Sequence, residues 1–138
     1  MNIAFFLVPK NEVVCLSPDS TIRQALERME YHRFSAVPLL DQDGRYVGTI
    51  TEGDLLWKLK NTAGLSFESS HKAYLKDVPQ RMHNKPVHVD SQIEDLISLA
   101  KVQNFVPVID DKAIFIGIIR RSDIIDYCAK LLFKQEQK

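Results

Sequence analysis

Short apolar runs, polar turns and segments of helical periodicity alternate along this chain of 138 residues. Two apolar runs, at 36–40 and 46–50, flank an aspartate- and glycine-containing turn, which predicts an antiparallel hairpin. Residues 21–31 carry apolar side chains at helical spacing behind a threonine suited to cap a helix, and a second helical pattern begins at Glu52. With a strand candidate at 13–16, the first half of the chain predicts the order strand, helix, strand, strand, helix.

The same order recurs in the second half of the chain. A strand is predicted at 87–89, a helix after it, paired strands at 106–109 and 115–119, and a final helix from about Ser122, with a frayed polar end at 134–138. Four anchor residues align at one constant offset: Gly48 with Gly117, Asp54 with Asp123, Pro38 with Pro107 and Asp41 with Asp110. A shared offset at four anchors indicates an internal repeat.

The polar segment between the two copies is predicted to be a linker. We expect the first domain at residues 8–60, the linker with a short helix at 61–83, and the second domain at 84–132. Each copy has the order β-α-β-β-α, so the fold class is α/β (α+β). Because one copy alone would bury little apolar surface, we expect the two copies to pack about a pseudo-twofold axis into one globular module with a shared core.

Composition and charge exclude several classes of function. Apolar residues make up 45% of the chain and charged residues 26%, which is ordinary for a globular protein. Lysine plus arginine equals aspartate plus glutamate, at 18 each, and this balance argues against a general nucleic-acid binder. The N-terminal apolar stretch, 3–8, is too short to span a bilayer and lacks the features of a secretory signal. We therefore expect a cytoplasmic protein without a membrane partner.

The start of the second helix is the best candidate for chemistry. A strand that ends near Ile50 and leads into a helix leaves backbone N–H groups free, which favours an anion. Thr51 adds a hydroxyl there, and Asp54 adds a carboxylate one turn further on. A phosphate at Thr51 and a sugar diol at Asp54 would fit this spacing. The alternative is structural, with Thr51 as an N-cap and Asp54 as a favourable charge at the helix dipole.

Catalytic and metal sites have no such support. His71, His83 and His88 lack close metal-ligand spacing, so we expect no metal. No serine or cysteine nucleophile motif, Walker loop or dinucleotide-binding fingerprint is present. The chain is therefore not expected to be an enzyme or to hold a cofactor.

Two segments resemble a known family. His32-Arg33-Phe34-Ser35-Ala36-Val37-Pro38-Leu39-Leu40-Asp41, followed by Gly48-Thr49-Ile50-Thr51-Glu52-Gly53-Asp54, resembles the cystathionine-β-synthase (CBS) domain. Residues 106–110 and 117–123 resemble it again, as in the tandem pair called a Bateman module. The resemblance covers residues 8 to 130. It implies a regulatory module without catalysis that binds AMP, ADP, ATP or a related adenosyl ligand such as cyclic di-AMP between the repeats.

The resemblance also implies ligand-binding residues. In such modules the aspartate at the Asp54 position binds ribose hydroxyls, and the threonine at the Thr51 position contacts phosphate. His32 and Arg33 match a pair that lies beside the ligand phosphate in one member of the family; otherwise they are a solvated helix end. The candidates for the first cleft are Thr49, Thr51, Asp54, His32 and Arg33, with Lys85, Pro86, Val87 and His88 from the opening strand of the second copy. The candidates for the second cleft are Arg120 and Asp123, with Val13.

The second copy departs from the family pattern at two places. Arg120 stands where a threonine or serine is usual, and nothing corresponds clearly to His32 and Arg33. An arginine can hold a phosphate through several charged donors, fill the cleft, or pair with a nearby acid. These alternatives remain open at this point.

Two further expectations concern assembly. The apolar faces of the second and last helices predict a homodimer, since such helices pair across a twofold axis in this family; the residues are Leu55, Leu56, Leu59, Ile124, Ile125 and Cys128. A regulated partner protein is implied but not identified. The alternative function is a structural or dimerisation module that binds no ligand.

Overall fold

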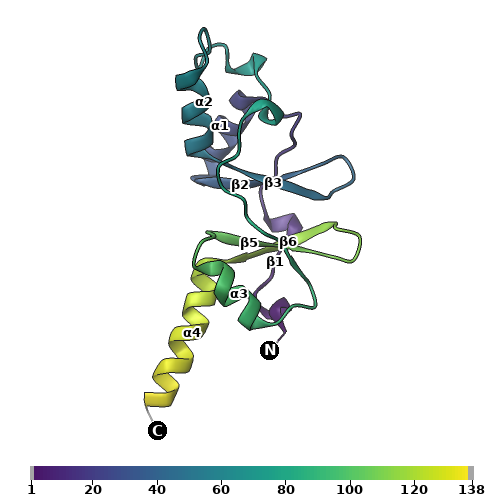
Figure 1. Cartoon of the computed structure of the whole chain (residues 1–138), viewed down its shortest axis with the longest axis vertical. Coiled ribbons are helices and arrows are strands. Elements are labelled where there is room, and N and C mark those ends of the chain that lie inside the picture. The colour runs from purple at the N-terminus through teal and green to yellow at the C-terminus, as the bar shows by residue number, and fades with distance from the viewer. Residues whose placement is uncertain (1, 137–138) are drawn as a thin grey trace. The chain divides into compact units, whose positions relative to one another are not determined.

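The first half of the chain forms two helices and a hairpin in the computed structural model, which describes residues 2–136 (Figure 1). Its elements are α1 (Ile22–His32), β2 (Ala36–Leu40), β3 (Tyr46–Thr51) and α2 (Glu52–Asn61). Strands β2 and β3 pair antiparallel, as the turn chemistry predicted. Both helices begin at a threonine whose side chain accepts a backbone N–H of the first turn, which explains why they start where they do.

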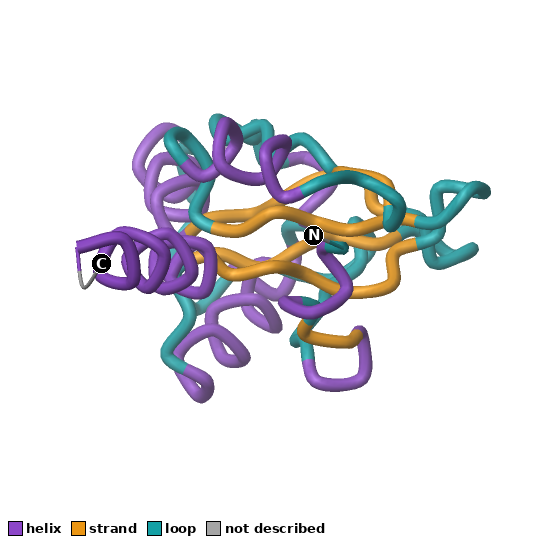
Figure 2. Tube along the Cα trace, turned by 90° about the horizontal axis from the view of Figure 1, so that it is seen from below, coloured by secondary structure: helices purple, strands orange, loops and turns teal. Residues whose placement is uncertain are grey.

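The second half of the chain repeats this pattern within a four-stranded sheet. Its elements are β4 (Val87–His88), α3 (Ile93–Ala100), β5 (Phe105–Ile109), β6 (Phe115–Arg120) and α4 (Arg121–Glu136). The sheet order is β1-β6-β5-β4, where β1 is Val8–Pro9 from the N-terminal segment. Figure 2 distinguishes these strands from the helices by colour. The polar end predicted at 134–138 begins inside α4, and its last two residues lie outside the described part of the chain.

Residues 13–16 do not form the predicted strand. Within this run, Leu16 forms an isolated parallel bridge to Leu39. The run begins in a turn instead, because the amide of Val13 donates to the carbonyl of Lys10 at the end of the 3₁₀ helix η2 (Lys10–Glu12).

The segment predicted to be a linker with a short helix has only short helical turns. This segment contains two 3₁₀ turns, η3 (Ser70–Lys72) and η4 (Leu75–Asp77). The amides of Leu75 and Lys76 donate to the carbonyls of Ser20 and Pro18, so they cannot continue a helical hydrogen-bond ladder.

Two compact units make up the chain, and their limits differ from those of the sequence repeats. One unit is Val14–His83, and the other joins the residues up to Val13 to those from Asn84 onward. The segment expected to be a linker belongs to the first unit, where Leu75 and Val78 are buried in the core. The N-terminal segment belongs to the second unit, because β1 pairs antiparallel with β6.

Each unit has a hydrophobic core of its own. The first core is built around Ile22, Ile50 and Leu55, each 0% exposed. The second is built around Leu96 and Ile119, also 0% exposed. The strands and helices therefore position candidate site residues separately in each unit.

The outer faces of α2 and α4 remain apolar. Leu55 and Ile124, expected among the dimer-forming residues, are buried in the two cores and are unavailable to a partner. Exposed apolar side chains extend along the same helices instead: Leu56 and Trp57 on α2, and Ile125, Leu131, Leu132 and Phe133 on α4. The last turns of α4 project away from the rest of its unit (Figure 1). Among residues 2–136, no helix is both long and apolar enough to cross a membrane.

Gly117→Ala is expected to destabilise the protein more than Gly48→Ala. A Cβ on Gly117 would overlap the backbone oxygen of Val8, so β1 would have to move away from β6. A Cβ on Gly48 would meet the amide group of Gln80, and a flexible side chain moves more easily. Overpacking costs typically about 1–3 kcal/mol, and we place Gly117→Ala in that range. Urea unfolding of both variants measures the difference, and a larger loss for Gly48→Ala would contradict this account of β1.

Candidate functional site

The start of α2 forms a capping box in the unit Val14–His83. The Thr51 hydroxyl accepts the amide of Asp54 at 3.1 Å, and Oδ2 of Asp54 accepts the amide of Thr51 at 3.0 Å. The structural role considered for these two residues is therefore present. Such reciprocal bonds satisfy two of the N–H groups that a helix start leaves free, so fewer donors remain there for an anion.

The second oxygen of Asp54 is also occupied. Oδ1 accepts the backbone amide of Arg81 at 3.1 Å, and Asp54 as a whole is 2% exposed. Beside it, the amide of Thr49 donates to Oε1 of Gln80 at 3.3 Å, and Thr49 is 0% exposed. The guanidinium of Arg81 lies over the Trp57 ring, 5.3 Å from its centroid. In this structure residues 80–81 thus cover both candidate residues, and sequence reasoning did not find this segment.

Tyr46 completes the polar cluster at this end of β3. Its hydroxyl shares a hydrogen bond of 2.6 Å with Oγ1 of Thr49. Burial raises the pKa of Tyr46 above its ordinary value of 10.0, and the hydrogen bond to Thr49 lowers it by a smaller amount. The neutral phenol is therefore favoured in the folded protein.

Tyr46 is expected to make the protein less stable at high pH. Because its pKa is raised on folding, the unfolded chain loses this proton first as the pH passes about 10. The stabilisation that the protonated Tyr46 gives the folded protein is complete below that pH. It disappears as the pH rises through the folded-state pKa of Tyr46. Urea unfolding measures the free energy of unfolding at about pH 9 and at about pH 11. Its decrease between the two should be larger for the parent than for Tyr46→Phe. Equal losses in the two proteins would contradict the assignment.

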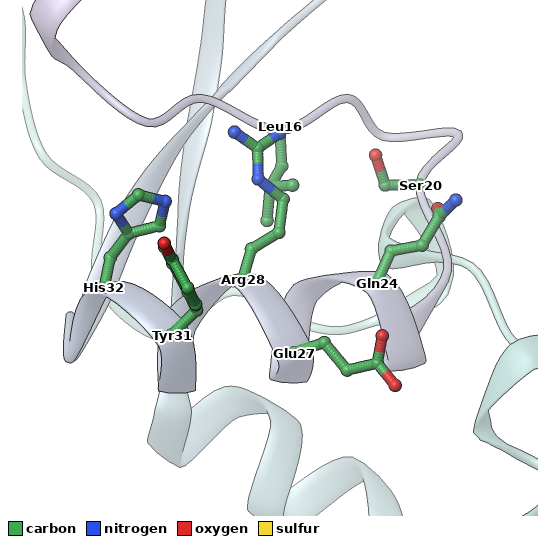
Figure 3. A pocket seen from close by; sticks show the side chains of 7 residues that line it. All are labelled: Leu16, Ser20, Gln24, Glu27, Arg28, Tyr31 and His32. Carbon is green, nitrogen blue, oxygen red and sulfur yellow. The ribbon is translucent and has the colours of Figure 1, made fainter.

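The structure places His32 and Arg33 at two different pockets. His32 lines a pocket of 440 Å³ along α1 (Figure 3). Its ring also stacks on Phe34, at a centroid distance of 5.6 Å. Arg33 adopts the left-handed conformation as C-cap of α1, with φ of 58°. This conformation places Arg33 at another pocket, of 860 Å³, together with Ser35 and Glu52.

The α1 pocket contains a second basic group, Arg28, that sequence reasoning missed. Figure 3 shows Arg28 extending from α1 toward Leu16, and His32 and Glu27 from the same helix also line the pocket. Glu27 pairs with Arg23, at 3.6 Å. The signal in the sequence was the spacing of four residues between Arg28 and His32, which places both on one helix face.

In the other unit, Arg120 and Asp123 form an ion pair at the start of α4. Nε of Arg120 lies 2.9 Å from Oδ2 of Asp123, and Nη2 donates to Oδ1 at 3.5 Å. Of the three roles left open for Arg120, pairing with a nearby acid is the one the structure contains. The Asp123 side chain is 28% exposed, so unlike Asp54 it remains accessible.

This ion pair lines a pocket of 460 Å³ within its own unit. The N-terminal segment contributes Phe5, Phe6, Leu7, Val8 and Glu12, and α4 contributes Asp126, Tyr127 and Lys130. Val13, the residue expected here, follows this segment and is not among the lining residues. The helical spacing of residues 126, 127 and 130 from Asp123 was the signal for the α4 residues. Nothing local in the sequence indicated Phe6, which packs edge-on against Tyr127 at 5.3 Å between ring centroids.

The strand segment at 85–88 is held by a buried glutamine. Gln103 is 3% exposed; its Oε1 accepts the amide of Lys85 at 2.8 Å, and its Nε2 donates to the Lys85 carbonyl at 3.1 Å. The side chain of Val87 belongs to the core, whereas Lys85 and Pro86 are exposed. Lys85 and Pro86 are thus free to meet a ligand by their side chains, and Val87 is not.

His88 contacts two carboxylates that the sequence did not connect with it. Nε2 of His88 lies 2.6 Å from Asp111, and Nδ1 lies 3.5 Å from Asp90. One ligand atom from each of these three residues lies within 4.8 Å of the others, so they can hold a divalent cation. Both aspartates are exposed. The histidine spacings considered in the sequence could not find this group, because Asp111 lies in the turn between β5 and β6.

Comparison with known proteins agrees with the repeat. The sequence model of the CBS domain matches the chain twice, at residues 7–61 and 75–130. A CBS domain-containing protein of Dictyostelium discoideum is 30% identical over 122 residues, which cover 83% of this chain and 83% of that protein.

Two solved structures share the fold. The crystal structure of CbpB in complex with c-di-AMP has a TM-score of 0.83 at 21% identity, covering 99% of this chain and 90% of CbpB. The crystal structure of CBSX2 in complex with AMP has a TM-score of 0.74 at 20% identity, covering 94% of this chain and 97% of CBSX2. The predicted resemblance and the mixed α/β fold are confirmed.

Proposed function

The chain belongs to the CBS domain family, and on that premise we propose that it is a regulatory module that binds adenine nucleotides and has no catalysis of its own. The pocket at the start of α4 carries the proposal. Asp123 offers an accessible carboxylate for ribose hydroxyls, and Arg120 offers charged donors for a phosphate. The rings of Phe6 and Tyr127 add aromatic surface on which a base can stack.

The residues at the start of α2 are proposed as a second nucleotide site. Asp54 would bind the ribose and Thr51 the phosphate, with Thr49 beside them. The other residues proposed to take part in ligand binding are His32, Arg33, Lys85, Pro86, Val87, His88 and Val13. The capping box does not exclude this role, because a hydroxyl and a carboxylate each accept more than one hydrogen bond.

The ligand class follows from the family and from two structural neighbours. CbpB was solved with c-di-AMP and CBSX2 with AMP, and both ligands contain adenosine with a phosphate. Calorimetric titration with AMP, ADP, ATP and c-di-AMP tests the proposal, with GMP as the control for the base. Binding of at least one adenine ligand in preference to GMP is expected. The proposal fails if none of the four adenine ligands binds at millimolar concentration.

The alternative function is a structural or dimerisation module without a ligand. The burial of Asp54, at 2% exposed, favours it, because a covered carboxylate is not ready to receive a sugar. The open pocket around Asp123 opposes it. The same titration separates the two, since a structural module would bind none of these nucleotides.

A homodimer formed through α2 and α4 is the proposed assembly. Soluble monomers rarely expose contiguous apolar patches, and α4 carries exposed side chains at Ile125, Leu131, Leu132 and Phe133. A second copy that covers these faces would remove them from water. Regulation would then act through a protein partner whose affinity changes when the nucleotide binds.

A further inference from the structure

The two repeats hold their equivalent aspartates in different ways. Asp123 pairs with the side chain of Arg120 and stays 28% exposed at its side chain. Asp54 is 2% exposed, and both of its oxygens accept backbone amides, one from Thr51 and one from Arg81. An arginine side chain can rotate away from its partner, whereas releasing a backbone amide requires movement of the chain.

Three contacts hold residues 80–81 in place over Asp54. The Arg81 amide donates to Oδ1 of Asp54 at 3.1 Å. Oε1 of Gln80 accepts the Thr49 amide at 3.3 Å, and the Arg81 guanidinium lies 5.3 Å from the centre of the Trp57 ring. All three are polar or cation–π contacts, and the Arg81 side chain is exposed. The segment can therefore lift from α2 without opening the hydrophobic core.

The fixed end of this segment lies just before it. Val78 is 4% exposed and belongs to the core of its unit, so the chain is anchored there. Pro79, which follows, is exposed, and residues 79–83 contain no helix or strand. A movement that begins after Val78 would leave the core contacts intact.

We propose that residues 80–81 form a latch that closes the Asp54 site and must open for a nucleotide to bind there. The latch rests on the proposed function, because it regulates the same site. A ribose hydroxyl would have to take the place of the Arg81 amide at Oδ1 of Asp54, since that oxygen is covered by residues 80–81. Binding at Asp54 therefore works against the latch contacts, whereas the Asp123 side chain is already 28% exposed among residues 2–136. The two sites fill in sequence, Asp123 first.

The test uses the full chain carrying Asp123→Ala, so that AMP binding reports on the Asp54 site. Gln80→Ala removes the acceptor of the Thr49 amide, and Trp57→Ala removes the surface under Arg81. Each weakens the closed latch without removing a proposed nucleotide contact, so each should tighten AMP binding by about two- to fivefold. Lys60→Ala is the matched control, because it removes another cation over the Trp57 ring, at 5.5 Å, and leaves the ring under Arg81 in place.

A second readout follows the latch itself. In the free protein the Arg81 amide is expected to exchange slowly with deuterated water, because it is bonded to a buried carboxylate. Saturating AMP should speed this exchange, and Gln80→Ala should speed it without AMP.

The latch is wrong if AMP binds at Asp54 while the Arg81 amide stays equally protected and the Gln80→Ala and Trp57→Ala variants bind AMP no more tightly. That result would contradict the latch but not the proposal that the protein binds nucleotides. Failure of every variant, and of the parent, to bind AMP or c-di-AMP would overturn the proposed function together with the latch.

Discussion

Replacing Asp123 with alanine is expected to weaken AMP binding at the α4 pocket by about ten- to a hundredfold. The carboxylate would accept hydrogen bonds from the ribose hydroxyls, and bonds to a charged group contribute about 1.5–3 kcal/mol. Asp126→Ala is the matched control, because Asp126 lines the same pocket but lies outside the Arg120–Asp123 pair. Calorimetry measures both variants. Parent-like affinity in Asp123→Ala would remove this residue from the site.

Arg120→Ala separates the phosphate from the sugar. If the guanidinium binds the phosphate, AMP should lose affinity while adenosine does not, because only the charged ligand loses its partner. Arg120→Lys keeps the charge but loses the planar pair of donors. Its affinity for AMP should therefore fall between those of the parent and Arg120→Ala. Equal losses for AMP and adenosine would assign Arg120 to positioning Asp123 instead.

Asp54→Ala is a less direct test of ribose binding than Asp123→Ala, because it also affects the stability of the protein. The variant would leave the amides of Thr51 and Arg81 without their acceptor, and an unpaired buried group costs about 1–3 kcal/mol of stability. The 2% exposure of Asp54 means that this loss of stability accompanies any loss of ligand binding. Asp54→Asn keeps the size and one acceptor oxygen, so it is the better variant for nucleotide titrations.

Charged residues on α4 are expected to convert the proposed dimer to a monomer. Leu132 and Phe133 are 61% and 63% exposed, and burying a side chain of this kind contributes about 1.5–3 kcal/mol. The double variant Leu132→Glu and Phe133→Glu removes both contributions and places two charges in the interface. The dissociation constant should therefore rise by about a thousandfold or more.

Sedimentation velocity at micromolar concentration measures this change. Lys134→Glu is the matched control, since it alters charge on the same turn without removing apolar surface, and it should remain dimeric. A parent protein that sediments only as a monomer would contradict the dimer. A dimer that survives the double glutamate variant would move the interface away from the end of α4.

The sequence by itself determined the two hairpins, the four α-helices and the repeat. Strands β2 and β3 were predicted because an apolar run, an Asp-Gly turn and a second run are local signals, and the helix starts at Thr21 and Thr51 follow from capping chemistry. The aligned glycines and aspartates also identified which helix starts to examine. The pairing of Arg120 with a nearby acid was among the expected alternatives, and Asp123, in the first turn of α4 just after the end of β6, is that acid.

The tertiary structure alone decided which segments complete each unit and which acid is accessible. Val8–Pro9 joins the sheet of the second repeat, and Leu75 enters the core of the first, through contacts between residues far apart in the chain. The cover over Asp54 comes from the backbone amide of Arg81, a donor that every residue except proline carries. Side-chain identity encodes periodicity and caps, but the partner of a backbone amide depends on how distant segments pack. For that reason two aspartates in matching sequence positions differ in exposure.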